Sequence, residues 1–269
     1  MGRPRKYTLD ENYFENIISD NATYALGFIY ADGSIYHNYL SVKLSAKDIE
    51  ILNFLKSELN YNGIISKYVV KNREYVGLTV SSKKIISDLI NLGVVYNKTY
   101  LSKTLPIYPK EYENSFLRGF FDGDGSISLN NCRGKAEYTI TYSSNKTVLN
   151  EIKQILLKNN ISCCNIRHRH NSDESCMLEI RGNRNIEKLY KLLYDNAEFY
   201  LKRKKERFDN FMLMLEGLKK RNILDETISD ISELYCFGLK QTEIARIKGM
   251  PSSSVRTVVQ RLRKHGKIE

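Results

Sequence analysis

The chain contains short segments in which apolar and polar residues alternate, as is typical of strands with one buried face. In residues 39–45, for example, Leu40, Val42 and Leu44 fall on one side and polar residues on the other. The same pattern predicts further strands at 34–38, 63–70, 75–80, 126–130, 137–143, 165–171 and 176–181. Apolar residues spaced three and four apart predict helices at 48–59, 83–92, 148–158 and 185–195.

These segments occur in the same order twice, once in residues 21–110 and again in residues 111–221. Each half has a helix, two strands, a helix, two strands and a final helix. Such an internal duplication predicts an α+β fold built from two αββαββα repeats, each with an antiparallel sheet.

A related ten-residue segment opens each repeat. Residues 24–33 are YALGFIYADG, and residues 116–125 are FLRGFFDGDG. In the first copy Gly27 and Ala31 are four residues apart, and in the second Gly119 and Gly123 are. Small residues at that spacing share one helix face and let two helix backbones approach closely. We therefore expect the two segments to be helices that pack against each other.

Each helix is expected to end at an acidic residue, Asp32 or Asp124, followed by a glycine. Gly33 and Gly125 are predicted to adopt the left-handed conformation common at helix ends. A carboxylate is unfavourable at a helix C-terminus, and two of them side by side repel each other. A hard divalent cation with oxygen ligands would relieve this repulsion, which indicates a site for Mg²⁺, or for Mn²⁺, between Asp32 and Asp124.

The paired segments resemble the motif of the LAGLIDADG homing endonucleases, in the single-chain form with two motif copies. The resemblance covers about residues 21–208 and implies two saddle-shaped antiparallel sheets that lie in the DNA major groove. Asp32 and Asp124 match the catalytic acids, and the carbonyls of Ala31 and Gly123 are expected to complete the metal coordination. Copy one departs from the consensus at Tyr30, where the family often has Asp.

The resemblance also implies basic and polar residues around the metal site. A family lysine that helps to organise the attacking water matches Lys98 in the first repeat. In the second repeat Lys204 aligns best and Lys202 is the alternative. A cluster that contacts phosphate would explain these basic stretches as well. Asp48 and Asn145 match a polar position at the active centre.

Composition favours a polyanionic partner. The 269 residues carry a formal net charge of +11, and 42% of them are hydrophobic. The sequence has no apolar run of about 20 residues and no signal-peptide pattern, so neither membrane insertion nor secretion is expected. Five cysteines without a framework spacing suit a reducing, intracellular compartment, either cytoplasm and nucleoid or an organelle matrix. Residues 1–20 are expected to form a basic N-terminal arm.

One strand is expected to read DNA bases. Asn165, Arg167, Arg169 and Asn171 are predicted to share one face of it, and Arg and Asn are the side chains that pair with guanine and adenine edges. Other candidate DNA contacts are Lys43, Lys67, Lys71, Arg73 and Arg181. Individually, each of these residues is more often a phosphate contact or a solvated charge than a base reader, so the prediction is of a DNA-binding face and not of any one base contact.

Residues 222–269 differ in character from the repeats. Helices are predicted at 225–237, 240–248 and 253–265, and the pattern resembles a helix-turn-helix of the sigma-factor or resolvase type. The last helix is basic, as expected of one that enters the major groove. Its candidate base contacts are Ser252, Ser253, Ser254 and Arg256. The alternative is a small helical cap on the catalytic core.

Together these features predict a monomeric homing endonuclease of a mobile element that needs no protein partner. It would hydrolyse phosphodiester bonds in both strands of a long, asymmetric DNA site. Two alternatives keep the fold: a DNA-binding regulator that does not cleave, and an RNA maturase that assists intron splicing.

Overall fold

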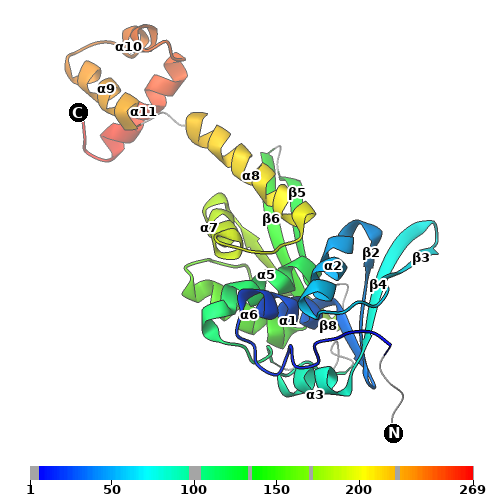
Figure 1. The fold of residues 1–269 in the computed structure, drawn as a ribbon. Coiled ribbons are helices and arrows are strands. Elements are labelled where there is room, and N and C mark those ends of the chain that lie inside the picture. Colours follow the sequence, from blue (N-terminus) through cyan, green and yellow to red (C-terminus); the bar gives the residue numbers. More distant parts are fainter. Residues whose placement is uncertain (1–5, 97–103, 133–134, 170–171, 222–224, 269) are drawn as a thin grey trace. The chain divides into compact units, whose positions relative to one another are not determined.

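The computed structural model describes residues 6–96, 104–132, 135–169, 172–221 and 225–268 (Figure 1). The chain divides into two compact units, residues 1–211 and 212–269. No helix in the described residues is long and apolar enough to cross a membrane.

The first unit contains two repeats of the same element order. Repeat one comprises α1 (Asp20–Asp32), β1 (Gly33–Tyr36), β2 (Tyr39–Ser45), α2 (Ile49–Glu58), β3 (Ser66–Val70), β4 (Arg73–Ser81) and α3 (Lys83–Asn91). Repeat two comprises α5 (Glu113–Asp124), β5 (Gly125–Cys132), β6 (Lys135–Ser144), α6 (Lys146–Lys158), β7 (Arg167–Arg169), β8 (Ser172–Arg181) and α7 (Asn183–Tyr194). A long helix, α8 (Lys202–Arg221), then runs into the second unit.

Each repeat has a four-stranded antiparallel sheet, with the strand orders β1-β2-β4-β3 and β5-β6-β8-β7. In the first sheet the buried pairs Leu40–Val80 and Val42–Leu78 point to one face, while the intervening pair of Ser41 and Thr79 points to the other. Helices α2 and α3 contact the first sheet, and α6 and α7 contact the second. Each sheet therefore has one face covered by helices and one polar face, which confirms the prediction of a duplicated α+β fold.

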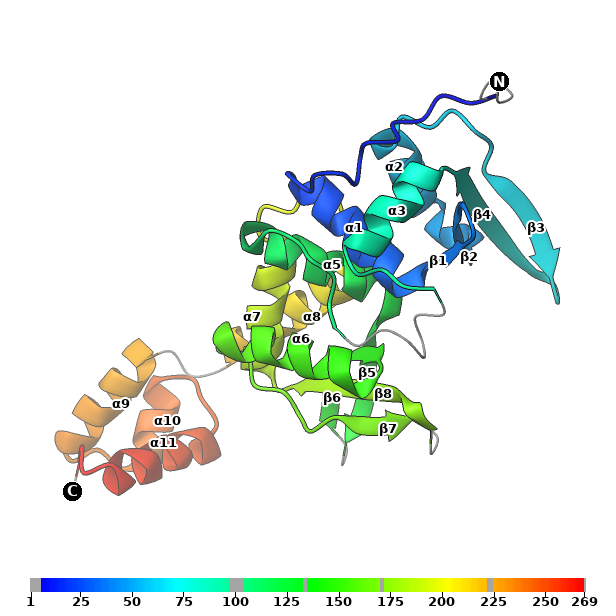
Figure 2. The same ribbon diagram turned by 90° about the horizontal axis from the view of Figure 1, so that it is seen from below.

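Helices α1 and α5 lie side by side between the two sheets (Figure 2). A Cβ atom on Gly27 would lie 2.3 Å from the carbonyl oxygen of Phe116, and one on Gly119 would lie 2.1 Å from that of Tyr24. Real Cβ atoms essentially never approach a backbone atom so closely, so only glycine permits this helix contact. The glycine spacing in the sequence therefore has the predicted effect.

The glycines after the two motif helices do not adopt the expected left-handed conformation. Gly33 has φ −73° and ψ 156°, and Gly125 has φ −92° and ψ 157°, because each begins a strand directly after its helix. Glycine is needed here for a steric reason. A Cβ on Gly33 would lie 2.6 Å from the carbonyl oxygen of Ile29, and one on Gly125 would lie 2.4 Å from that of Phe121.

The predicted strand at 165–171 is also shorter than expected. β7 includes only three residues, and the register shifts between His168 and Arg169. Asn165 precedes the strand, and Asn171 lies outside the described residues. The prediction that four residues share one strand face is therefore wrong, because the irregular register breaks the alternation.

After the end of α8, the described part of the second unit contains three short helices, α9 (Asp225–Cys236), α10 (Gln241–Ile247) and α11 (Ser252–Lys264). Their apolar sides form one small core that consists of Ile231, Ile244, Ala245, Val255, Val258, Val259 and Leu262. Between α10 and α11, Gly249 has φ +59° and the amide of Met250 donates to the carbonyl of Ala245. This tight connection keeps α11 packed across α10.

Candidate active site

The two motif acids lie together at one end of the helix pair. Asp32 is the last residue of α1, and Asp124 is the last residue of α5. A Cβ on Gly123 would lie 3.5 Å from Cγ of Asp32, so the Asp32 carboxylate is placed against the helical turn that carries Asp124. Asp32 is exposed and Asp124 is half-buried. Two carboxylates from different repeats therefore share one solvent-accessible site.

The oxygen atoms available here fit a hard divalent cation. Carboxylates of Asp32 and Asp124 and the adjacent carbonyls of Ala31 and Gly123 are all hard ligands of the kind that Mg²⁺ prefers. In the described residues no group of three or more His, Cys, Asp and Glu side chains could hold a metal. The remaining coordination positions would thus be left to water or phosphate oxygens, as is usual for Mg²⁺.

Lys204 is buried directly behind this site. Its Nζ atom donates to the carbonyls of Phe121 (2.6 Å), Asp122 (2.8 Å), Gly123 (3.2 Å) and Gly125 (2.7 Å). An ammonium group has three N–H donors, so these four acceptors use all of them. Burial lowers the pKa of Lys204 to about 8, while the charges of Asp122, Asp32 and Asp124 act in the opposite direction. The ammonium group therefore compensates both the C-terminal dipole of α5 and the nearby acids.

The other lysines proposed for the active centre are placed differently. Lys98 lies outside the described residues. Lys202 has an exposed side chain whose Nζ is 3.9 Å from Glu50 of repeat one. Of the two candidates in the second repeat, Lys204 is the one next to the motif acids.

A buried polar network lies deeper in the interface between α1 and α5. Oδ2 of Asp122 accepts hydrogen bonds from the hydroxyl of Tyr24 (2.7 Å) and the amide of Leu201 (2.8 Å). Burial raises the pKa of Asp122 to about 6. Arg118, also buried, donates to the carbonyls of Leu193 and Phe199 and pairs with Asp20. This network ties both motif helices to the residues that precede α8.

Neither Asp122 nor Arg118 was predicted from the sequence to have a role. A signal was present for Asp122, because the second motif copy has two acids where the first has Tyr30 and Asp32. The structure shows that the extra acid is buried in the helix interface, where it bonds to Tyr24. Tyr30 instead donates a hydrogen bond to the carbonyl of Thr104.

Asp48 and Asn145 precede the second helix of their repeats but have different partners. Nε and Nη2 of Arg203 donate to the two carboxylate oxygens of Asp48 at 2.5 and 2.7 Å. Asn145 caps its own helix, since its Oδ1 accepts a hydrogen bond from the amide of Val148 at 3.0 Å. Asp48 is therefore joined to α8 through Arg203, a partner that was not predicted from the sequence.

The open face of the first sheet carries only part of the predicted DNA surface. Lys43 pairs with Gly77 and Arg73 pairs with Val70, which places both basic residues on the polar face, and Lys71 lies in the turn beside them. Lys67 pairs with Val76, whose side chain is buried on the other face. Lys67 thus points to the helix-covered side, where the expected DNA contact is not supported.

In the second sheet Arg181 pairs with Thr139 and donates to Glu179 at 2.7 Å. Arg167 pairs with Met177, two residues from Glu179 on the same strand, and is therefore on the same face as Arg181. Both arginines are exposed. For Arg169 the structure describes the backbone alone.

The serines proposed as base contacts are at the start of α11 in the second unit. Ser252 and Ser253 are exposed, Ser254 is half-buried and Arg256 is exposed. The opposite side of α11 packs into the small helical core through Val255, Val258, Val259 and Leu262. The polar face of α11 is thus accessible within its own unit.

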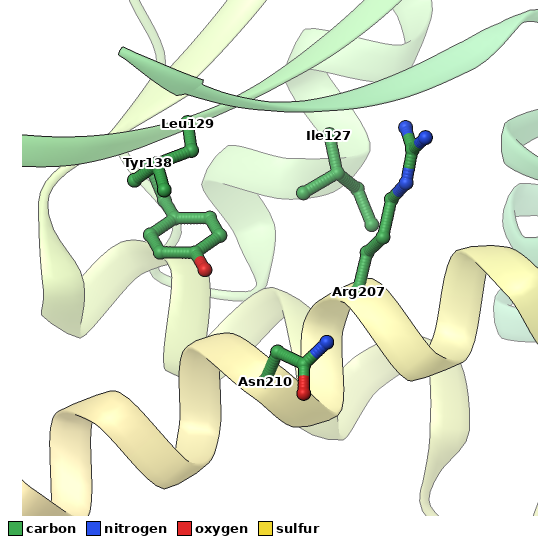
Figure 3. A pocket seen from close by; sticks show the side chains of 5 residues that line it. All are labelled: Ile127, Leu129, Tyr138, Arg207 and Asn210. Carbon is green, nitrogen blue, oxygen red and sulfur yellow. The ribbon is translucent and has the colours of Figure 1, made fainter. Parts of the chain in front are cut away.

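A pocket of about 280 Å³ lies beneath the edge of the second sheet and is separate from the acids (Figure 3). Ile127, Leu129 and Tyr138 of the sheet line it, and Arg207 and Asn210 of α8 form its polar side. Ile127 pairs with the buried Ile140, so the pocket is on the helix-covered side of the sheet and not on its polar face.

Comparison with known proteins supports the duplicated fold. Residues 111–194 match the family model described as a LAGLIDADG-like domain. The structure of the I-LtrWI LAGLIDADG homing endonuclease bound to target DNA aligns with 78% of this chain and 92% of that chain, with a TM-score of 0.53 and 16% identity. That of I-GzeII in complex with its DNA target covers 77% and 93%, with a TM-score of 0.52 and 16% identity. The chain carries a LAGLIDADG-like domain, and its fold is the duplicated fold of the LAGLIDADG homing endonucleases.

Two curated relatives are much longer proteins. A probable translation initiation factor IF-2 of Thermococcus kodakarensis is 26% identical over 231 residues, which are 82% of this chain and 18% of that protein. A DNA polymerase of Thermococcus sp. strain GE8 is 32% identical over 127 residues, which are 45% of this chain and 7% of that protein. The chain thus spans less than a fifth of the curated relatives it matches.

Proposed function

We propose that this chain is a site-specific endonuclease that hydrolyses both strands of double-stranded DNA with Mg²⁺ or Mn²⁺. The observation that carries the proposal is the convergence of Asp32 and Asp124, one from each repeat, at the solvent-accessible end of the α1–α5 pair. Two acids in one site match two scissile phosphates, one on each strand. The DNA-bound homing endonucleases that share the fold support DNA as the substrate.

In this proposal the chain's own residues hold and orient the reacting groups. Asp32 with the carbonyl of Ala31, and Asp124 with the carbonyl of Gly123, would bind the metal ions. Bound metal would lower the pKa of a coordinated water and stabilise the leaving oxygen. Lys204 keeps the end of α5 in place and supplies positive charge beside the acids. Lys98 is proposed to serve the first repeat in a comparable way.

The polar faces of the two sheets are proposed to bind the DNA duplex. Lys43, Arg73, Arg167 and Arg181 lie on these faces and would contact phosphates or base edges. The formal net charge of +11 supports binding to a polyanion. Because both motif copies are in one chain, the proposed enzyme is a monomer, which sedimentation without DNA would test by showing one species of about 31 kDa.

We further propose that the second unit is a helix-turn-helix that extends the DNA contact. Helices α10 and α11 are joined by a tight turn, and the exposed face of α11 starts with Ser252 and Ser253 and continues to Arg256. Four basic residues, Arg256, Arg261, Arg263 and Lys264, lie on α11 itself. A basic helix of this kind would fit a major groove next to the site bound by the sheets.

A cleavage assay on a randomised library tests the proposed function and identifies the target in the same experiment. The purified chain is incubated with a plasmid library that carries randomised inserts, with Mg²⁺ or with EDTA, and linearised products are sequenced. Enrichment of one long asymmetric sequence only with Mg²⁺ is the expected result. Specific DNA capture without linear product would instead indicate a regulator. Binding to intron RNA but not to DNA, measured in a parallel RNA-capture experiment, would indicate a maturase.

A further inference from the structure

Four consecutive residues, Leu201 and the first three residues of α8, bond to both repeats: the outer two to repeat two and the inner two to repeat one. The amide of Leu201 donates to Asp122 of repeat two, and the amide of Lys202 donates to Oε1 of Glu50 in repeat one at 2.9 Å. Arg203 then pairs with Asp48 of repeat one, and Lys204 returns to the end of α5 in repeat two. Residues 201–204 thus connect the two halves of the first unit by side-chain and main-chain bonds.

The contact between Arg203 and Asp48 is bidentate. Both carboxylate oxygens are bound by one guanidinium fork, a geometry that is stronger and more directional than a single charged hydrogen bond. Asp48 is 7% exposed, so water could replace its partner only in part. The pair joins residues 155 positions apart in sequence.

Asp48 lies at the same end of repeat one as the motif acid. β1 begins at Gly33, immediately after Asp32, and Gly33 pairs with Val42 in the middle of β2, which ends at Ser45. The short turn that follows β2 leads directly to Asp48. Through its hydrogen bonds to Asp48, Arg203 is therefore joined to this end of repeat one.

We propose that residues 201–204 form an inter-repeat clasp and that Arg203 is a positioning residue within it. Through Asp48, Arg203 holds the end of repeat one that carries Asp32. Lys204, its neighbour in the chain, holds the end of repeat two that carries Asp124. The clasp keeps the two acids in the relative position needed to cut both strands. This inference rests on the proposed endonuclease function.

The test uses Arg203→Gln, Asp48→Asn and the double variant, with Arg203→Lys as the conservative change. Arg207→Gln is the matched control, because Arg207 is an exposed arginine one turn further along α8 beside the pocket described above (Figure 3). Supercoiled plasmid with the selected target is cut in single-turnover reactions. The rates of nicking and linearisation and the Mg²⁺ concentration for half-maximal rate are measured. DNA affinity is measured separately with EDTA.

Either single substitution is expected to slow linearisation about 10- to 100-fold, because small displacements of reacting groups have effects of this size. Nicked circles should accumulate, and the half-saturating Mg²⁺ concentration should rise, whereas DNA affinity should change less than about threefold. The double variant should be no slower than the slower single variant, and Arg203→Lys should retain part of the rate. The clasp would be overturned by any one of three results: wild-type cleavage rates in both single variants, multiplicative effects on the rate in the double variant, or an equal loss of rate in Arg207→Gln.

Thermal unfolding of the same full-length variants separates this inference from the proposed function. If the clasp exists, the melting temperature should fall by several degrees in each single variant, with little further loss in the double variant. If the melting temperatures fall in this way but the wild type does not cleave DNA, the endonuclease function and the positioning role are refuted and the structural clasp is retained. If the changes in melting temperature are additive in the double variant and no larger than that of Arg207→Gln, the clasp is refuted whether or not the wild type cuts DNA.

Discussion

The hydroxyl of Tyr24 on one motif helix donates a 2.7 Å hydrogen bond to the buried carboxylate of Asp122 on the other. The two residues are 98 positions apart, and each is in the same motif segment of its repeat as Asp32 or Asp124. The bond therefore joins the motif helices across their interface, below the site where Asp32 and Asp124 meet.

Removal of this donor is expected to destabilise the first unit. Tyr24→Phe should lower the free energy of unfolding by about 1–3 kcal/mol, because a buried carboxylate loses one of its two hydrogen bonds. Urea unfolding at neutral pH measures the change. Tyr36→Phe is the control: Tyr36 is 68% exposed on the first sheet, and its change should remain within about 0.5 kcal/mol. Similar losses in both variants would contradict the importance of the buried bond.

The close contact of α1 with α5 makes a second prediction. Gly119→Ala would place a Cβ 2.1 Å from the carbonyl oxygen of Tyr24, so the helices must separate. The free energy of unfolding should fall by about 3 kcal/mol or more, or the protein should not fold. Gly77→Ala is the control, because its Cβ would meet the rotatable hydroxyl of Ser66 at 2.9 Å, and its effect should be within about 1 kcal/mol. Equal stability of the two variants would show that the helix contact is looser than the structure indicates.

If Asp32 and Asp124 bind metal as proposed, their substitution should affect cleavage much more than DNA binding. Asp32→Asn or Asp124→Asn should abolish cleavage of at least one strand, because an amide is a weaker metal ligand than a carboxylate. DNA affinity should stay within about tenfold of wild type, or about 1.4 kcal/mol. Gel-based cleavage and fluorescence anisotropy measure the two effects on one target. A fully active variant would remove that acid from the proposed site.

Truncation after residue 221 tests the role of the second unit. The remaining chain keeps both repeats and residues 201–204, so it should fold and should cut DNA at high protein concentration. Affinity should fall, and the dependence of log K on log[salt] should flatten by about 0.9 for each lost phosphate contact. The footprint should shorten at one end only, because the unit occurs once. If both the footprint and the salt slope are unchanged, the second unit is a helical cap.

The thiol of Cys163 offers a test of packing in repeat two. Burial raises the pKa of Cys163 to about 11, and its S–H group donates a hydrogen bond to the carbonyl of Ile161, with a distance of 3.6 Å from Sγ to the oxygen. The reactive thiolate is therefore scarce at pH 8 and should become common only as the pH approaches 11. Alkylation of Cys163 at pH 8 should be at least about tenfold slower than that of the exposed Cys236, as measured by peptide mass mapping. Equal rates would mean that this segment is open to solvent.

Local sequence patterns were sufficient to predict the parts of the molecule that depend on short-range rules. Alternating residues such as Leu40 and Val42 identify strands, and Gly27 and Gly119 identify the helix contact, because both patterns repeat within one segment. The conformation of Gly33 was predicted wrongly because the rule for helix ends assumes that the chain turns away. Here it continues straight into β1.

The partners of the buried charges could not be predicted in the same way. Asp48 was identified as a polar residue of the active centre, but its bond to Arg203 joins positions 155 residues apart. Lys204 was identified from its place in a basic stretch, yet the two residues before it, Lys202 and Arg203, bond to the other repeat. Such pairs arise from the docking of repeats, and no periodicity within either repeat encodes them.

The bonds made by residues 201–204 also limit how freely the two halves can be recombined. A chimaera that takes repeat one from this chain and repeat two from a relative would inherit Asp48 and Glu50 from one parent and the start of α8 from the other. In such a hybrid, the start of the relative's α8 must supply an arginine and a main-chain amide at the positions that meet Asp48 and Glu50 of this chain. This requirement holds even if the contact between the two motif helices is intact. The exchangeable part for engineering is thus repeat one together with residues 201–204, and not repeat one alone.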